Sequence, residues 1–255
     1  SEGDRLYGRG TCDAKGIAAA MMTAAERLAA EGEERVDLLF VVGEERGSDG
    51  ARMANQLPAT SRFLINGEPT ESNLATGTKG ALRVLLRTKG REAHSAYAEL
   101  GDSAITPMMR LLLEVDALEL PTDPVLGTST VNVGLIKGGT GANIVPGSCE
   151  AELMIRVVGD PEPVRNAVDA WVGGRAEVSY PAYTPAQRFH DVPGFPAKVF
   201  AYTTDVPLLT RWGTPLLFGP GSITVAHTPD EYVDSAELRA SVDTYMTLVR
   251  TLLAS

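Results

Sequence analysis

Residues 36–43 form an apolar run, interrupted only by Asp37, that ends at two adjacent acids, Glu44 and Glu45. An almost continuous apolar stretch of this length is typical of a strand buried on both faces of a parallel α/β sheet. Open α/β sheets bind their ligands beyond the carboxyl ends of such strands. The pattern therefore predicts a strand over 36–43 with a functional crevice at its end. Taken alone, the same stretch also fits a strand followed by a solvated acidic turn.

A third acid, Asp13, lies in the glycine-punctuated stretch 7–16, which runs into a helical pattern over 17–28. Glycines let the backbone bring a carboxylate close to another group without steric conflict. A carboxylate directly before a helix also faces the positive end of the helix dipole. Asp13 is therefore a candidate for a ligand that bridges two metal ions.

Two further polar groups that can bind a metal occur later in the chain. Glu68 comes after the short apolar run 63–65, and His227 lies in a loop before a predicted helix over 235–253. Neighbouring acids diverge at a strand end, so one can bind a cation while the other acts as a general base on a water held by that cation. Together these residues predict a metal-dependent active site.

Six stretches of the chain resemble, in order, the motifs of the M20 family of co-catalytic metallohydrolases. This family includes acetylornithine deacetylase, succinyl-diaminopimelate desuccinylase, aminoacylases and carboxypeptidase G2. The matching stretches are 8–16, 43–45, 67–70, 90–96, 138–146 and 226–231. Each is a weak signal alone, but six in family order span nearly the whole chain.

The resemblance implies a role for each polar residue. Asp13 would bridge two zinc ions, with a cis peptide bond after it. Glu68 would bind one ion, while Glu45 and His227 would complete the other, a donor set that suits zinc and also admits Co²⁺ or Mn²⁺. Glu44 would be the general base, taking a proton from a metal-held water that attacks an amide carbonyl and passing it to the departing amine.

One family ligand is missing, because the family has a further metal-binding histidine upstream of the residue that Asp13 matches. None of the three histidines, His94, His190 and His227, precedes Asp13. We therefore expect the chain to be a fragment of a longer enzyme that binds one zinc ion better than two and is impaired or inactive. We also expect apolar sheet surface to be exposed. The alternative is a catalytically silent relative that serves as a dimerising or binding module.

The order of predicted elements indicates an α/β catalytic domain, residues 1–75 and 186–255, with a mostly parallel sheet. An α+β domain with ferredoxin-like order, residues 76–185, interrupts it. Its predicted strands are 80–88, 128–136, 149–157 and 176–180, and its predicted helices are 103–118 and 162–172. In the family, this inserted domain is the lid and the dimerisation domain, so the resemblance implies a homodimer.

The resemblance assigns further roles outside the metal ligands. His94 would reach across a dimer to stabilise the carbonyl oxygen, although a surface histidine is the plainer interpretation. Asn143 and Arg156 would bind polar groups of the substrate, with Arg156 suited to a carboxylate. Gly219 and Gly221 would offer backbone donors to a substrate carboxylate, or they would simply form a tight turn.

Three more residues carry weaker expectations. Asp205 lies where family members shape the pocket. Asp230 and Glu231 either orient His227 from behind or form a charged turn before the last helix.

Composition narrows the class of protein. The formal net charge of −10 argues against nucleic acid and anionic membrane surfaces as partners. No apolar run approaches the roughly 20 residues of a membrane span. Cys12 and Cys149 are too few for a disulfide framework and favour a reducing, cytoplasmic location. The predicted reaction is amide hydrolysis of an N-acyl amino acid, of the deacetylase or desuccinylase type, or of a small peptide.

Overall fold

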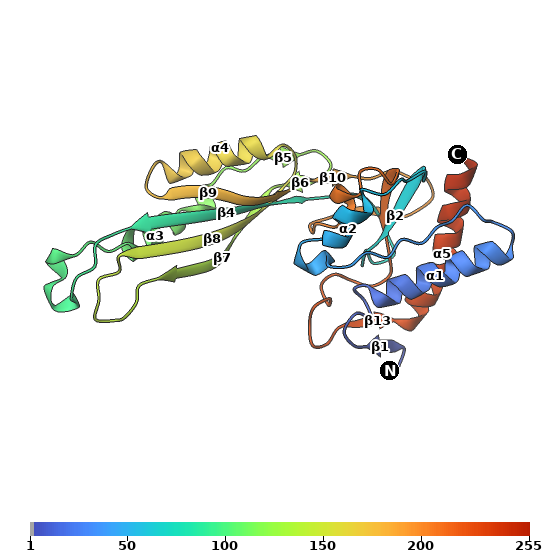
Figure 1. Ribbon diagram of the computed structural model, residues 1–255, viewed down its shortest axis with the longest axis horizontal. Helices are drawn as coiled ribbons and strands as arrows, with labels where there is room; N and C mark the ends of the chain where they lie inside the picture. The colour runs from blue at the N-terminus through green and yellow to red at the C-terminus, as the bar shows by residue number, and fades with distance from the viewer. Residues whose placement is uncertain (1–2) are drawn as a thin grey trace. The chain divides into compact units, whose positions relative to one another are not determined.

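The computed structural model describes residues 3–255 as a mixed α/β protein, as predicted, with two compact units (Figure 1). Unit 1 consists of the chain up to Gly77 together with Arg188–Phe200 and Thr204–Ser255. Unit 2 consists of Thr78–Gln187 and Ala201–Thr203. In this part of the chain, no helix is both long enough and apolar enough to cross a membrane.

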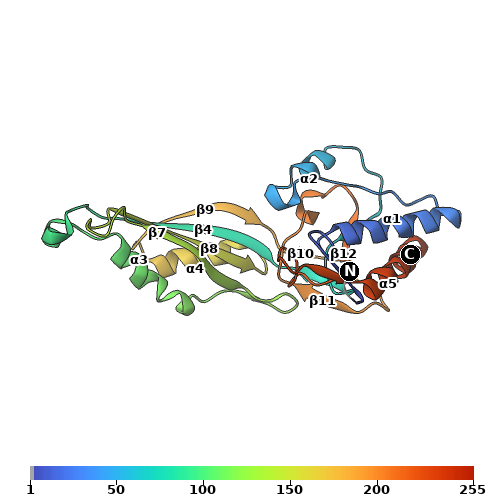
Figure 2. The same ribbon diagram turned by 90° about the horizontal axis from the view of Figure 1, so that it is seen from below.

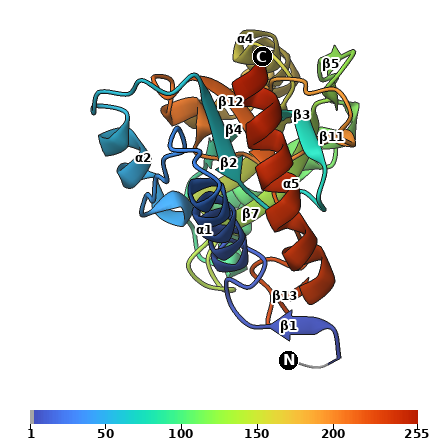
Figure 3. The ribbon, with the colours of Figure 1, turned by 90° about the vertical axis from the view of Figure 1, so that its right-hand side faces the viewer.

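Unit 1 is built around two long helices, α1 (Lys15–Ala30) and α5 (Ser235–Ala254), and a parallel strand pair, β2 (Phe63–Gly67) and β12 (Thr214–Phe218). Figure 3 shows the two helices beside this pair. Buried α1 residues recur every three or four positions, which is the spacing of a helix with one apolar face. They pack with α5 and β12 into one core, which includes Ile17, Leu28, Leu216, Phe218 and Leu248.

The smaller elements of unit 1 lie around this core. β1 (Arg5–Tyr7) pairs antiparallel with β13 (Tyr232–Asp234), and β3 (Leu74–Thr78) lies between β10 (Gln187–Arg188) and β11 (Ala197–Phe200). The short helices are η1 (Glu44–Arg46), α2 (Asp49–Ala54) and η4 (Val206–Leu208). The side chain of Asp234 caps α5 by accepting from the N–H groups of Ala236 and Glu237.

The strand predicted over residues 36–43 is not formed. Leu39 and Val41 pack against the small apolar cluster around α2, but Phe40 and Val42 point outward and are 63% and 75% exposed. A strand requires a neighbouring backbone to pair with its N–H and C=O groups. No strand of residues 3–255 lies beside this segment, so the chain stays extended without forming a ladder. This unpaired segment therefore contributes exposed apolar side chains to the surface of unit 1.

Unit 2 is a four-stranded antiparallel sheet in the order β7-β8-β4-β9, with two helices on one side (Figure 2). The strands are β4 (Gly80–Lys89), β7 (Thr130–Gly138), β8 (Ser148–Val157) and β9 (Glu177–Thr184). The helices are α3 (Ile105–Leu112) and α4 (Pro161–Val172). Burial alternates along β4 and β8, so every second side chain enters a core shared with both helices. This strand order is the ferredoxin-like arrangement predicted from the sequence.

The predicted helix over 103–118 is shorter than expected. α3 ends at Leu112, and a separate 3₁₀ turn, η3 (Val115–Ala117), follows it. The N–H groups of Glu114, Ala117 and Leu118 bond to carbonyls three residues earlier, which tightens the chain into 3₁₀ geometry. A small hairpin of β5 (Thr122–Asp123) and β6 (Gly127–Thr128) then leads to β7.

Candidate metal centre

Asp13 lies at the end of the loop that joins β1 to α1. The carbonyl of Gly10 accepts from the N–H groups of Lys15 at 2.8 Å and Gly16 at 3.2 Å, which closes the loop onto the first turn of the helix. A Cβ atom on Gly16 would lie 2.2 Å from the carbonyl oxygen of Thr11, so this position requires glycine. The peptide bond between Asp13 and Ala14 is cis, as the resemblance implied. The direction of the Asp13 carboxylate is thus fixed by a tightly bonded loop.

Glu44 and Glu45 lie on the 3₁₀ turn η1 rather than at a strand end. Gly43 and Gly47 flank this turn with φ values of 82° and 107°, in the left-handed region that glycine favours. Glu45 contacts His227, whereas no such contact is found for Glu44 among the described residues, and the negative charge of Asp205 helps to raise the pKa of Glu44.

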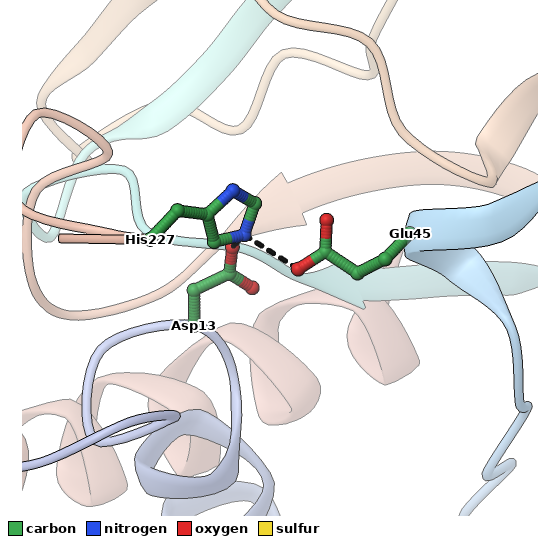
Figure 4. Close-up of side chains that lie close together, drawn as sticks. All are labelled: Asp13, Glu45 and His227. Atoms are coloured by element: carbon green, nitrogen blue, oxygen red, sulfur yellow. Dashed lines mark ion pairs between the residues drawn. The ribbon is translucent and has the colours of Figure 1, made fainter.

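Asp13, Glu45 and His227 converge from three distant segments (Figure 4). The Nε2 atom of His227 lies 3.0 Å from Oδ2 of Asp13 and 2.5 Å from Oε1 of Glu45. One ligand atom from each of the three residues lies within 4.8 Å of the others. The guanidinium of Arg9 also reaches Oε1 of Glu45, at 3.2 Å.

His227 has a φ of 62°, which places a non-glycine residue in the left-handed region. This conformation is uncommon for a residue with a Cβ atom and costs roughly 1–2 kcal/mol. The surrounding loop maintains it through local bonds, including Val225 N–H to the Ser222 carbonyl and the Thr228 hydroxyl to the Val225 carbonyl. Unfavourable backbone geometry at a candidate ligand points to a functional requirement.

The acids of this site repel one another. Burial raises the pKa of Glu44 to about 7, and the carboxylates of Asp205, Glu45 and Asp13 act in the same direction. Burial likewise raises the pKa of Asp13, and this effect outweighs the opposing effect of His227. A bound cation would relieve this repulsion, because it stabilises the ionised form of every nearby carboxylate.

Glu68 follows β2 and is half-buried, but it is not part of the three-residue ligand group. Its Oε1 atom accepts from Nδ2 of Asn66 at 3.4 Å. Burial, with Asp13, Glu44 and Asp205, holds the pKa of Glu68 well above its usual range. Glu68 therefore adds a further acidic group near Asp13 and Glu44.

Asp205 is 2% exposed, and neither carboxylate oxygen has a hydrogen-bond partner within residues 3–255. Buried carboxylates normally have such partners. Its negative charge helps to raise the pKa values of Glu44 and Glu68, so it adds to the electrostatic repulsion among the acids.

Glu231 has a different position from either of those anticipated. Its side chain does not reach His227 but accepts hydrogen bonds from the backbone N–H groups of Gly10, Cys12 and Asp13. Burial acts to raise the pKa of Glu231, but these three donors and Arg9 bring it below its usual range. The sequence contains Asp230 and Glu231 side by side, and nothing in the local pattern distinguishes which of the two turns inward.

The backbone donors of Gly219 and Gly221 are already engaged within unit 1. The N–H of Gly219 donates to the hydroxyl of Thr70 at 2.9 Å, and that of Gly221 donates to Oε1 of Glu237 at 3.0 Å. A Cβ atom on Gly219 would lie 2.5 Å from the carbonyl oxygen of Glu68. This geometry gives the two glycines a role in loop packing and leaves neither N–H free for a substrate.

His94, Asn143 and Arg156 lie in unit 2. The carbonyl of Asn143 accepts from the N–H of Ser95, so Asn143 and His94 are neighbours, and Nδ1 of His94 accepts from the N–H of Ala96. Arg156 lies near the other end of β8, opposite Ala81 of β4. Ser148, at the start of β8, is eight residue steps from Arg156, a distance of about 26 Å at the usual rise per residue. Within unit 2, Arg156 is therefore far from Asn143 and His94.

The donor set of the three-residue group fits zinc. Two carboxylates and one imidazole are common zinc ligands, and three protein ligands with one open position are typical of catalytic zinc sites. The group lies within a cluster of acids whose pKa values are raised, which is the electrostatic environment that a divalent cation compensates.

Comparison with known proteins gives a family match along nearly the whole chain. The model of peptidase family M20/M25/M40 matches residues 1–251. A peptidase M20 domain-containing protein of Schizosaccharomyces pombe is 41% identical over 255 residues, which cover 97% of this chain and 64% of that protein. A probable carboxypeptidase of Aspergillus fumigatus is 38% identical over 278 residues, which cover 97% of this chain and 63% of that protein. The chain thus spans just under two thirds of the length of these relatives.

The fold also matches solved structures. One is an M20 family metallo-carboxypeptidase from Sulfolobus solfataricus, with a TM-score of 0.68 and 18% sequence identity. The match covers 96% of this chain and 77% of that one. At this level of identity the comparison establishes the fold.

Proposed function

Because the chain belongs to peptidase family M20/M25/M40, we propose that it is the larger part of a metal-dependent hydrolase that cleaves an amide bond in a small peptide or an N-acyl amino acid. The observation that carries the proposal is the convergence of Asp13, Glu45 and His227, whose ligand atoms lie within 4.8 Å of one another. These three residues are separated widely in the sequence, and two of them are acids that repel each other unless a cation lies between them.

Zinc held by these three residues supplies an activated water at neutral pH and a Lewis acid for the amide carbonyl. Glu44 is the general base. Its pKa, raised to about 7, suits a group that takes a proton from the attacking water and returns it to the departing amine near neutral pH. Metal binding would lower this pKa, so the protonation of Glu44 and metal occupancy are linked.

The substrate carries a free carboxylate. The relatives include a probable carboxypeptidase, and a carboxypeptidase acts at the carboxyl end of its substrate. Arg156 is half-buried and has no ion-pair partner among the described residues, so its guanidinium is available for a carboxylate. Both N-acyl amino acids and peptides satisfy this requirement, and the deacylase and peptidase forms of the proposal share the same site.

The active form is a homodimer that pairs through unit 2. β7 is an edge strand whose side chains are almost all exposed, Leu135 and Ile136 included. Met109 of α3 is exposed as well, and Leu113, directly after that helix, is 82% exposed. An exposed edge strand beside an exposed apolar helix face suits pairing with a second copy about a two-fold axis. We propose that the partner supplies His94, as the resemblance to the family implies.

A second candidate is a catalytically silent protein that dimerises or binds a ligand through unit 2. The position of Glu68 favours this candidate, because Glu68 lies outside the single ligand group found among residues 3–255, so that a second zinc ion would have fewer protein ligands than the first. On this view the 255-residue chain holds one zinc ion and hydrolyses amides slowly or not at all.

The first experiment is metal analysis of the 255-residue chain after incubation with zinc and desalting. We expect about one zinc per chain, and none in the variant Glu45→Ala. No zinc in either protein would contradict the proposed metal centre.

Activity is tested on the full-length protein with a panel of N-acyl amino acids and dipeptides. Glu44→Gln should lower kcat by roughly 10²- to 10⁴-fold while zinc content is retained. Mixing Glu44→Ala with His94→Ala chains should restore part of the activity, since one hybrid site would carry both intact residues. No recovery above either parent would contradict the contribution of the partner.

A further inference from the structure

Glu231 joins the two loops that carry Asp13 and His227. Its side chain is 1% exposed, and its Oε1 atom accepts from the N–H groups of Gly10 at 2.9 Å, Cys12 at 3.1 Å and Asp13 at 3.0 Å. One carboxylate oxygen thus accepts from three backbone donors of the loop that presents Asp13. Groups of backbone N–H that point to one centre form an anion-binding nest.

The backbone of Glu231 binds the same loop. Its carbonyl accepts from the N–H of Gly8 at 2.9 Å and from the hydroxyl of Thr11 at 3.4 Å. These contacts continue the ladder in which Tyr7 of β1 pairs with Tyr232 of β13, the two strands that lie side by side in Figure 3. Glu231 is therefore the point where the paired strands separate into the two ligand-bearing loops.

The link extends to the third member of the ligand group. Nη1 of Arg9 lies 3.7 Å from Oε2 of Glu231, and Nη2 of the same guanidinium lies 3.2 Å from Oε1 of Glu45. His227 is only four residues before Glu231 in the chain. All three candidate ligands are thus connected to one buried carboxylate through the backbone, through hydrogen bonds or through Arg9.

We propose that Glu231 is a positioning residue that fixes Asp13 relative to His227 and thereby sets the zinc affinity of the site. The inference rests on the metal centre proposed above. Glu231 acts through the length and direction of its hydrogen-bond acceptor, because three buried N–H groups lose their partner when the acceptor is withdrawn. Partners of this kind, outside the direct ligands, commonly change metal affinity by 10- to 100-fold.

The test compares two substitutions in the 255-residue chain. Glu231→Asp keeps the negative charge but shortens the side chain, so the carboxylate no longer reaches all three N–H groups. Glu231→Gln keeps the length and an acceptor oxygen but removes the charge. Asp230→Asn is the matched control, because it changes the charge of the exposed neighbouring acid in the same loop. The readouts are zinc affinity by competition with a chelating dye and the visible absorption spectrum of the cobalt-loaded protein.

We expect Glu231→Asp to weaken zinc binding by roughly 10- to 100-fold and to alter the cobalt spectrum. Glu231→Gln should lose less affinity than Glu231→Asp, and Asp230→Asn should match the unsubstituted chain. If Glu231→Asp does not fold, as judged by circular dichroism, Glu231→Met replaces it, because methionine keeps the length without the acceptor. In that case we expect Glu231→Gln to bind zinc more tightly than Glu231→Met.

Two results would overturn the inference alone: unchanged zinc affinity in a folded Glu231→Asp protein, or a larger loss in Glu231→Gln than in Glu231→Asp. The second result would mean that the charge, and not the position of the acceptor, governs affinity. Absence of zinc binding in the unsubstituted chain would instead overturn the metal centre itself, and this inference with it.

Discussion

The two units treat buried polar groups and backbone geometry in opposite ways. In unit 2, charges lie on the outer face of the sheet in cross-strand pairs such as Arg83 with Glu152 and Arg87 with Glu150. Unit 1 instead buries Asp205 and Glu231 and contains the cis peptide bond. It also contains every described non-glycine residue with positive φ, namely Ser48, Glu71, Ser72 and His227.

This contrast follows from how each unit satisfies its backbone and its charges. Antiparallel strands satisfy their own backbone groups and bury alternate side chains, so unit 2 needs no unusual geometry. Unit 1 brings three distant segments together and holds several acids close to one another there. Such a cluster of like charges does not stabilise the fold unless a cation is bound. Four experiments test this contrast, in order of decreasing expected effect.

The largest effect is expected in the core of unit 2. Leu153 is fully buried in the central strand β8, and Leu153→Ala should lower the free energy of unfolding by about 2–5 kcal/mol, because it removes apolar contacts and leaves a cavity. Urea unfolding followed by circular dichroism measures this change. Zinc affinity should be unchanged, and Leu135→Ala on the exposed edge strand should have a much smaller effect. A parallel loss of zinc affinity would mean that the units do not behave separately.

Zinc should stabilise unit 1 alone. A ligand present at 100 times its Kd and bound only by the folded state adds about 2.7 kcal/mol to the free energy of unfolding. Calorimetry with and without zinc should show that zinc raises the unfolding temperature of unit 1 and leaves that of unit 2 unchanged. The variant His227→Ala should remove the shift. A shift of both transitions would contradict the separation of the two units.

The pH dependence of stability should have opposite signs in the two units. The pKa of Glu44 is raised from 4.5 to about 7 in the folded state, so between these values the folded state binds more protons than the unfolded state. Metal-free unit 1 should therefore lose stability as pH rises from about 4.5 to about 7. In unit 2, Lys89 holds the pKa of Glu177 below 4.5, so that contribution is present above pH 4.5 and is lost as pH falls.

Thermal unfolding across pH, without metal, measures both trends. Glu44→Gln should flatten the trend of unit 1, and Glu177→Gln should flatten that of unit 2. A rise in the stability of unit 1 over the same window would contradict the assignment of Glu44 as a carboxyl with a raised pKa.

The smallest effect is expected for a surface pair of unit 2. Arg87 and Glu150 are 2.8 Å apart and both are about half exposed. A double-mutant cycle of Arg87→Ala and Glu150→Ala should give a coupling energy of about 0.2–1 kcal/mol. The coupling should shrink in high salt. A coupling several times larger would mean that the stability of unit 2 depends on its charged face as well as on its core.

Much of the fold was predictable because its signals are local. The sequence predicted β4 and β8, along which burial alternates, and it predicted the helices α1, α4 and α5. The same reasoning failed for residues 36–43, where composition is typical of a strand but no neighbouring strand is present in the described chain. Strand formation depends on a partner as much as on the residues themselves.

Residue types alone were enough to mark Asp13, Glu45 and His227 as chemically suited to a metal centre, since carboxylates and imidazoles bind zinc. Which of these candidates meet depends on the tertiary structure, which leaves Glu68 outside the three-residue group. It also engaged the N–H groups of Gly219 and Gly221 and turned Glu231, rather than Asp230, toward the loop of Asp13. The physical reason is that a residue's type fixes what it can bind, whereas its partners are set by hydrogen bonds between segments more than 200 residues apart.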